Sequence, residues 1–134
     1  MSRLIDARVA ATVLLIGLAA LAVFHILAMI GLVPADMVWG GRAEGNVFAM
    51  ELSALLVALL FGLLVAVRTG DVVAPGLRRV ARIGMWVMVV FFTLSIIGNL
   101  ASTSSLERAI FTPLSVILAV MALRLALEKG DMRA

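Results

Sequence analysis

The chain has 134 residues, of which 64% are hydrophobic and 14% charged, and its formal net charge at pH 7 is +3. Soluble domains carry roughly 45–50% apolar and about 25% charged residues, so this composition indicates a membrane protein, with length for one domain. Because there is no cysteine, disulfides, thiolate metal sites and iron–sulfur clusters are excluded. The eleven basic residues form no basic domain, and no nucleic-acid partner is predicted.

Four apolar runs stand out along the chain. They comprise residues 9–33, 47–67, 83–100 and 110–127. Each matches the roughly 17–25 residues of helix that cross a hydrocarbon core. The first run exceeds the about 7–15 apolar residues of a signal peptide, so we predict a retained helix. The predicted fold class is all-α, an integral membrane four-helix up-down bundle, and residues 1–134 are predicted to form this single domain.

Glycines and prolines mark the predicted helix ends. Pro34 follows the first helix and cannot extend it easily. Thr112-Pro113 resembles an N-cap followed by proline at the first helical position, which would leave residues 106–111 at the membrane interface. The other predicted breakers are Gly70, Pro75 and Gly76 between the second and third helices, and Gly130 as the C-cap of the fourth.

Lys and Arg are distributed unevenly between the two ends of the predicted helices. Only Arg42 and Arg108 lie at one end. The other nine lie at the opposite end: Arg3, Arg8, Arg68, Arg78, Arg79, Arg82, Arg124, Lys129 and Arg133. The positive-inside rule makes the richer side, with both termini, cytoplasmic. We therefore predict a multi-pass protein of the bacterial cytoplasmic (inner) membrane.

Small residues predict a packing face on the second helix. Ala54, Ala58, Gly62 and Ala66 recur every four residues, a small-xxx-small pattern that lets helix backbones approach closely. The two predicted hairpins share no motif, which gives no support to an inverted-repeat transporter within one chain.

Six polar residues of the apolar runs fall toward the outer side. They are His25, Glu51, Ser95, Asn99, Thr112 and Ser115. Three of them, His25, Glu51 and Asn99, lie on faces that helical periodicity predicts to pack, and we expect them to converge on a pocket open to the outer surface. His25 lies roughly 12 Å inside the predicted end of its helix and Glu51 roughly 6 Å, so a direct contact needs helix tilt, side-chain reach or a bridging water.

Each of these residues also has a purely structural interpretation. Asn99 would serve as an interhelical hydrogen-bond donor, and His25 as a satisfied structural histidine. Glu51 would extend toward the lipid headgroups, and its negative charge would stabilise the positive N-terminal end of its helix. Their common side favours a functional pocket over three separate structural roles.

The first outer loop, residues 34–42, reads PADMVWGGR. Trp39 suits the membrane interface, Gly40-Gly41 permits a tight turn with positive φ, and Asp36 could pair with Arg42. The alternative is a folded cap in which Trp39 and Arg42 gate the mouth of the pocket.

This loop also carries a resemblance. The pattern P-x-D-x-V-W-G-G-R, with the upstream His25, the downstream Glu51, the G-N-x-x pattern at residues 98–101 and T-P-L at residues 112–114, resembles an uncharacterised family of small four-helix bacterial membrane proteins. The resemblance spans most of the chain. It implies a shared fold and a shared site, but it does not indicate any particular activity.

The chain lacks the residues that several kinds of cofactor site need. Bis-histidine haem ligation needs two histidines, and the chain has one. A retinal Schiff base needs a buried lysine, whereas Lys129 is predicted at the cytoplasmic end. His25 and Glu51 are too few ligands for a zinc hydrolase, and no serine is marked as a nucleophile. Copper(I) would suit His25 with Met29, Met37 and Met50, but methionine in membranes usually packs, and no metal or cofactor is predicted.

The function predicted first is binding of a small molecule or ion in the outward-facing pocket, for transport or sensing, in contact with membrane lipids. The predicted ligand-binding residues are His25, Glu51, Asn99, Trp39 and Arg42. His25 would respond to protons, with Glu51 as its charge partner or as a cation ligand. Because four helices are few for a transporter, we predict that the chain forms a homo-oligomer or part of a larger membrane complex. The alternatives are a non-catalytic accessory subunit of such a complex, and a membrane enzyme acting on a lipid or quinone.

Overall fold

The computed structural model describes residues 4–70 and 73–129, and within these ranges the chain is helical, with no strand. The main helices are α1 (Ala7–Met29), α2 (Val47–Thr69), α3 (Pro75–Ala101) and α4 (Thr112–Leu127). Short helices lie between them: η1 (Ala35–Met37), η2 (Trp39–Gly41) and the π-helix η3 (Glu107–Phe111). With η3 and α4 joined, four stretches are long and apolar enough to cross a membrane, which confirms the prediction of an all-helical, multi-pass protein.

The first helix ends at Met29, four residues before the predicted end at Val33. The backbone N–H of Leu32 donates to the carbonyl of Leu27 at 2.9 Å, and that of Gly31 to Ala28 at 3.1 Å. With Gly31 at φ +80°, this is a Schellman termination, in which a left-handed glycine satisfies the last carbonyls. The attribution of the helix end to Pro34 was wrong, because Gly31 ends it one turn earlier.

The third helix begins at Pro75, eight residues before the predicted start at Ile83. Pro75 occupies the first turn, where the missing N–H of proline has no intrahelical partner in any case. The apolar run marked only the part of the helix that suits lipid, and the arginine-rich turns before it are helical too. Pro75 and Gly76 therefore begin α3, and the prediction that they break the chain was wrong.

The fourth helix begins at Thr112, at the position predicted, but Thr112 is not its N-cap. Thr112 has helical φ and ψ of −62° and −57°, and its hydroxyl donates to the carbonyl of Glu107 at 3.2 Å. The helix continues from η3, so no free N-terminus needs a cap. Gly130, predicted as the C-cap of this helix, lies outside the described residues, as do Arg3 and Arg133.

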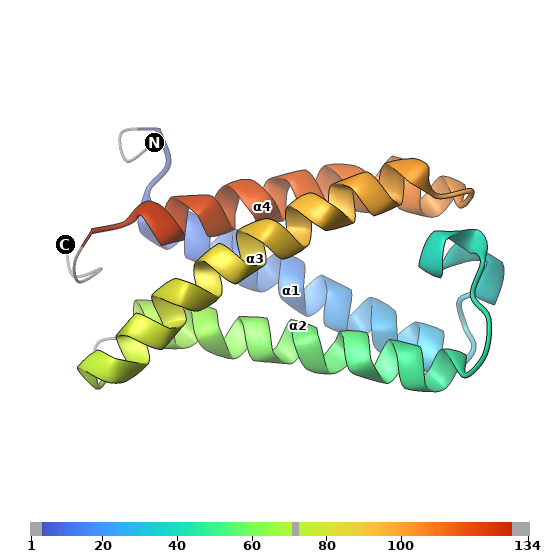
Figure 1. Ribbon diagram of the computed structural model, residues 1–134, viewed down its shortest axis with the longest axis horizontal. Helices are drawn as coiled ribbons and strands as arrows, with labels where there is room; N and C mark the ends of the chain where they lie inside the picture. Colours follow the sequence, from blue (N-terminus) through green and yellow to red (C-terminus); the bar gives the residue numbers. More distant parts are fainter. Residues whose placement is uncertain (1–3, 71–72, 130–134) are drawn as a thin grey trace.

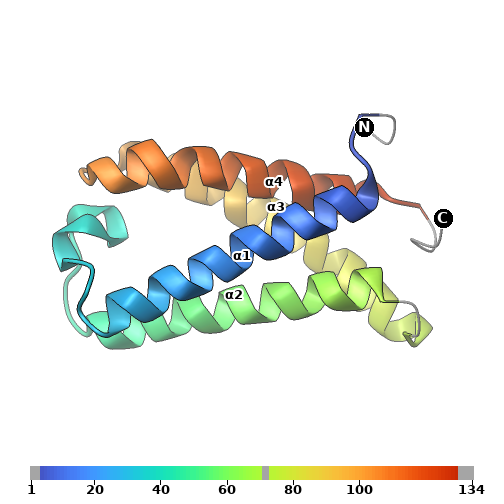
Figure 2. The same cartoon turned by 180° about the vertical axis from the view of Figure 1, so that it is seen from behind.

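The helices form two hairpins that cross. Figures 1 and 2 show α1 and α3 as the diagonals and α2 and α4 along the edges, with residue 4 and residue 129 at the same end of the molecule. Residues 34–46 lie at the opposite end, between the start of α2 and the start of α4 (Figure 1). The apolar core lies nearer the end with the termini and includes Leu14 of α1, Val65 of α2, Met85 of α3 and Leu125 of α4, each 0% exposed.

The small-residue pattern of α2 does not follow one packing face. Ala58 is buried, but a Cβ at Gly62 would have no atom within 4 Å, and Ala66 is exposed. The physical reason is that steps of four residues drift about 40° around a helix with 3.6 residues per turn. Close approach occurs elsewhere. A Cβ on Gly17 would lie 2.4 Å from Leu118, and one on Gly84 would lie 2.7 Å from Leu64.

Candidate functional site

His25 and Glu51 meet where α1 ends and α2 begins. His25 lies four residues before the end of α1, and Glu51 lies four residues after the start of α2. Each is therefore roughly 6 Å inside its helix, and the difference in depth that the sequence predicted disappears once α1 ends at Met29. The Nδ1 atom of His25 lies 2.6 Å from Oε2 of Glu51. The contact is direct, without a bridging water.

Glu51 is 0% exposed and accepts hydrogen bonds on both carboxylate oxygens. Besides His25 on Oε2, it accepts the indole N–H of Trp39 on Oε1 at 2.8 Å. Trp39 reaches this position from η2 with φ +53°, a left-handed conformation that is uncommon for a bulky residue and that persists only where the surrounding contacts hold it. The loop and both helices of the first hairpin thus share one buried carboxylate.

The same loop is fastened to the connection between α3 and α4. The backbone N–H of Gly40 donates to the carboxylate of Glu107, 3.2 Å from Oε1 and 3.0 Å from Oε2. The carbonyl of Gly40 accepts from Thr103, at 3.2 Å from its N–H and 3.0 Å from its hydroxyl. The hydroxyl of Ser104 donates to the carbonyl of Met37 at 2.9 Å. These bonds make residues 37–40 a lid that joins the two hairpins.

Beneath this lid lies a cavity of about 220 Å³. Its polar wall includes His25, Glu51, Glu107, Ser95, Asn99 and Ser115. Its aromatic wall is formed by Phe24, Trp39, Phe91, Phe92 and Phe111. A second cavity, of about 280 Å³, extends toward the core and shares His25, Trp39 and Phe92 with the first. The site combines an apolar chamber with a few converging polar groups, as is typical of small-molecule sites.

Asn99 lines this cavity but bonds to neither His25 nor Glu51. Its side-chain amide donates to the hydroxyl of Ser115 at 3.2 Å, which links α3 to α4. This is the interhelical role that the sequence offered as the alternative for Asn99. The structure brings His25, Glu51 and Trp39 together by hydrogen bonds and places Asn99 in the same cavity wall.

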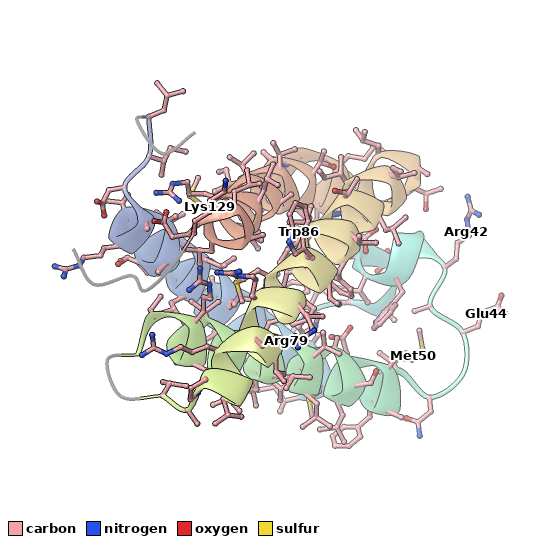
Figure 3. The ribbon with its side chains drawn as sticks, turned by 60° about the vertical axis from the view of Figure 1, so that its left-hand side comes forward. Arg42, Glu44, Met50, Arg79, Trp86 and Lys129 are labelled. Carbon is pink, nitrogen blue, oxygen red and sulfur yellow. The ribbon has the colours of Figure 1, made fainter. Side chains whose placement is uncertain are left out.

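Arg42 does not line the cavity. Its side chain is exposed and points away from the helices, as does that of Glu44 (Figure 3). Although both residues are described, Asp36 and Arg42 form no ion pair. Gly40 and Gly41, with φ of +74° and +71°, turn the chain outward immediately before Arg42. The expectation that Arg42 gates the mouth was therefore wrong.

Glu107 is the cavity residue that sequence reasoning missed. It was assigned to an interfacial segment, because the apolar run begins only at Ile110. Its position is set by η3, whose wider π-turn is frequent at functional sites. A signal was present: Glu107 is an acidic residue at the outer end of a span, where the sequence offers Arg42 and Arg108 as the only basic residues.

Within residues 4–70 and 73–129, no three His, Asp or Glu side chains are placed to hold one metal ion. The methionines considered with His25 for copper, Met29, Met37 and Met50, do not line either cavity. Comparison of the chain with protein-family models, curated proteins and solved structures found no match.

Proposed function

We propose that this chain is an up-down four-helix protein of the bacterial cytoplasmic membrane whose outer cavity binds a small molecule, for sensing or transport. The orientation is supported by the charge distribution. Arg42 and Arg108 lie next to the lid and to Glu107, whereas the other described cations lie at the start of α1, the end of α2, the start of α3 and the end of α4. These helix ends are on the side of the molecule where the described chain begins and ends (Figure 1). The cavity then opens toward the outer face.

The observation that carries the proposal is the environment of Glu51. A carboxylate that is 0% exposed lies in the wall of a cavity, with His25 on one oxygen and Trp39 on the other. Buried ionisable groups in membrane spans are costly and usually mark a binding or proton pathway. The Nε2 atom of His25 has no hydrogen-bond partner among the described residues, and His25 is available to a ligand from the cavity side.

Proton uptake at this pair would be transmitted to the lid. A protonated Glu51 has one oxygen that must donate, so it can no longer accept from both His25 and Trp39. The other charged group facing the pair is Glu107 across the cavity. Arg108 donates instead to the carbonyl of Ser102, and Arg42, Glu44 and Asp36 are exposed on the loop. Protonation of Glu51 would also remove the negative charge that strengthens its hydrogen bond from Trp39.

Closure of the inner half favours sensing over a continuous pore. Below the cavities, Leu14, Met88 and Leu118 are each at most 1% exposed and fill the space between the helices. These side chains block a path from the cavities to the inner side, unless the two hairpins move relative to each other. Transport would require such a movement, whereas sensing requires only release of the lid.

Trp39 provides the reporter for a direct test, because the chain has only two tryptophans. In Trp86→Phe protein, purified in detergent, Trp39 is the remaining tryptophan, and its emission is recorded from about pH 4 to 9, a range that covers ordinary Glu and His titration. We expect a sigmoidal change in emission that Glu51→Gln removes. Trp39→Phe protein, which reports Trp86 on the exposed face of α3, should show no such change. A Trp39 signal that is flat, or that titrates equally in Glu51→Gln, would refute the proton-responsive site.

A further inference from the structure

The cavity carries an imbalance of charge. Its titratable side chains are two carboxylates, Glu51 and Glu107, and one base, His25. Even with His25 protonated, two ionised carboxylates leave the cavity with one uncompensated negative charge. A buried charge without a partner is strongly unfavourable, so the cavity favours an added proton or an added cation.

The uncompensated carboxylate is that of Glu107. Glu107 is 9% exposed, and the single donor to its side chain within the described residues is the neutral N–H of Gly40, shared between both oxygens. An ionised carboxylate has about four acceptor positions, so most of those of Glu107 remain unused. Glu51, by contrast, holds a separate donor on each oxygen. The cavity wall therefore holds a second carboxylate, apart from the His25–Glu51 pair, whose acceptor positions are mostly unused.

Aromatic rings line the same cavity as this group. Phe111 is part of the same helical segment as Glu107, and its ring packs against Phe24 of α1 at a centroid distance of 4.6 Å. Phe91 and Phe92 of α3 complete the wall at a centroid distance of 5.4 Å from each other. Ring faces attract cations, more strongly when water is excluded. A bare metal ion would instead require several ligands at once, and no group of three His, Asp or Glu side chains in the described ranges is placed to hold one.

We propose that the ligand of this cavity is a small organic cation, a protonated amine or a quaternary ammonium, held by the Glu107 carboxylate and the aromatic rings of the cavity wall. The inference deepens the proposed function and rests on it. An anion of similar size is repelled by both carboxylates. A neutral molecule gains the apolar walls but leaves Glu107 without a counter-charge.

The test uses three ligands of similar shape and different charge. Trp86→Phe protein in detergent is titrated with benzyltrimethylammonium, with its uncharged carbon analogue neopentylbenzene, and with the anion phenylacetate, while Trp39 emission is recorded. We expect a saturable response to the cation alone. Glu107→Gln keeps an oxygen for the N–H of Gly40 but removes the charge, and should weaken cation binding about tenfold, equivalent to ~1.4 kcal/mol.

Two further variants separate charge in the cavity from charge elsewhere. Glu44→Gln removes a carboxylate from the exposed part of the loop and should leave cation affinity unchanged (Figure 3). Phe111→Leu keeps an apolar wall without a ring face and should weaken binding of the cation.

The outcomes distinguish this proposal from the proposed function. Equal binding of the neutral analogue, or unchanged cation affinity in Glu107→Gln, would overturn the organic-cation proposal. Absence of any response to benzyltrimethylammonium, with the pH response of Trp39 intact, would overturn it too while leaving the proton-responsive site in place. Loss of the pH response with retained, Glu107-dependent cation binding would support the cation site and refute the proton-responsive one.

Discussion

Gly41, the residue after the lid, approaches the connection between α3 and α4 so closely that a side chain has no room. A Cβ there would lie 2.2 Å from the hydroxyl of Thr103 and 3.2 Å from the carbonyl oxygen of Asp36. The residue also has φ +71°, which is costly for any residue with a Cβ. Glycine is therefore required at this position for two independent reasons.

Gly41→Ala should lower stability and loosen the lid. The left-handed conformation alone costs roughly 1–2 kcal/mol for a non-glycine residue, and displacement of Thr103 adds to it. Gly45→Ala is the matched control, because Gly45 has φ +84° but its Cβ would have no atom within 4 Å. We expect a larger fall in the thermal unfolding midpoint for Gly41→Ala, and a change in Trp39 emission for that variant only. Equal effects would show that the clash with Thr103 contributes nothing.

The partnership of His25 and Glu51 was predictable from sequence, but its geometry was not. Polarity and helical phase placed both residues on inward faces at the outer side. Their relative depth depended on where α1 ends, and hydrophobicity continues to Val33, four residues beyond the true end. The left-handed Gly31 that ends α1 has no hydropathy signature. The bond between Trp39 and Glu51 was hidden as well, because it depends on the positive φ of Trp39.

At the scale of the helix, the contact between α1 and α4 depends on Gly17. A Cβ on Gly17 would lie 2.4 Å from a methyl group of Leu118, which is 1% exposed and has little freedom to move. The absence of a side chain here lets the two helices approach near the middle of the bundle, a use of glycine that is frequent in membranes.

Gly17→Val should destabilise the bundle by overpacking, on the order of 1–3 kcal/mol. Gly62→Val in α2 is the control, since a Cβ at Gly62 meets nothing within 4 Å. The measurement is the thermal unfolding midpoint of each variant in the same detergent. If Gly62→Val is as destabilising as Gly17→Val, helix propensity rather than the α1–α4 contact explains the loss.

The number of long helices and the all-helical fold class were predictable, because lipid requires a certain length and an apolar composition of every span. The ends of helices and the connections between them depend on other contacts, which hydrophobicity does not indicate. The arginine-rich start of α3 and the π-turn at Glu107 fall outside the apolar runs. The π-turn is stabilised by tertiary contacts, such as the bond from the N–H of Gly40 to Glu107, between residues 67 positions apart. No local pattern could indicate that pairing, so the second carboxylate of the cavity was missed.

For the whole molecule, the orientation in the membrane can be tested cleanly because the chain contains no cysteine. Ala35→Cys lies in the exposed outer loop, and Ala74→Cys lies in the exposed connection before α3. Both changes leave every charge in place. In intact cells we expect an impermeant maleimide to label Ala35→Cys and to spare Ala74→Cys until the membrane is opened. The reverse pattern would invert the assigned orientation, and the cavity would then face the cytoplasm.

The hydrogen bonds of the lid join residues that are synthesised at different times. Trp39, Gly40 and both helices of the first hairpin leave the ribosome before Thr103 and Glu107, which lie 63 and 67 positions after Gly40. During that interval the loop can be held by Glu51 but has no anchor on its other side. Insertion of the second hairpin supplies the anchor and the remaining cavity wall in one step. Because each hairpin supplies only part of the cavity wall, the cavity can form only after both hairpins have been made.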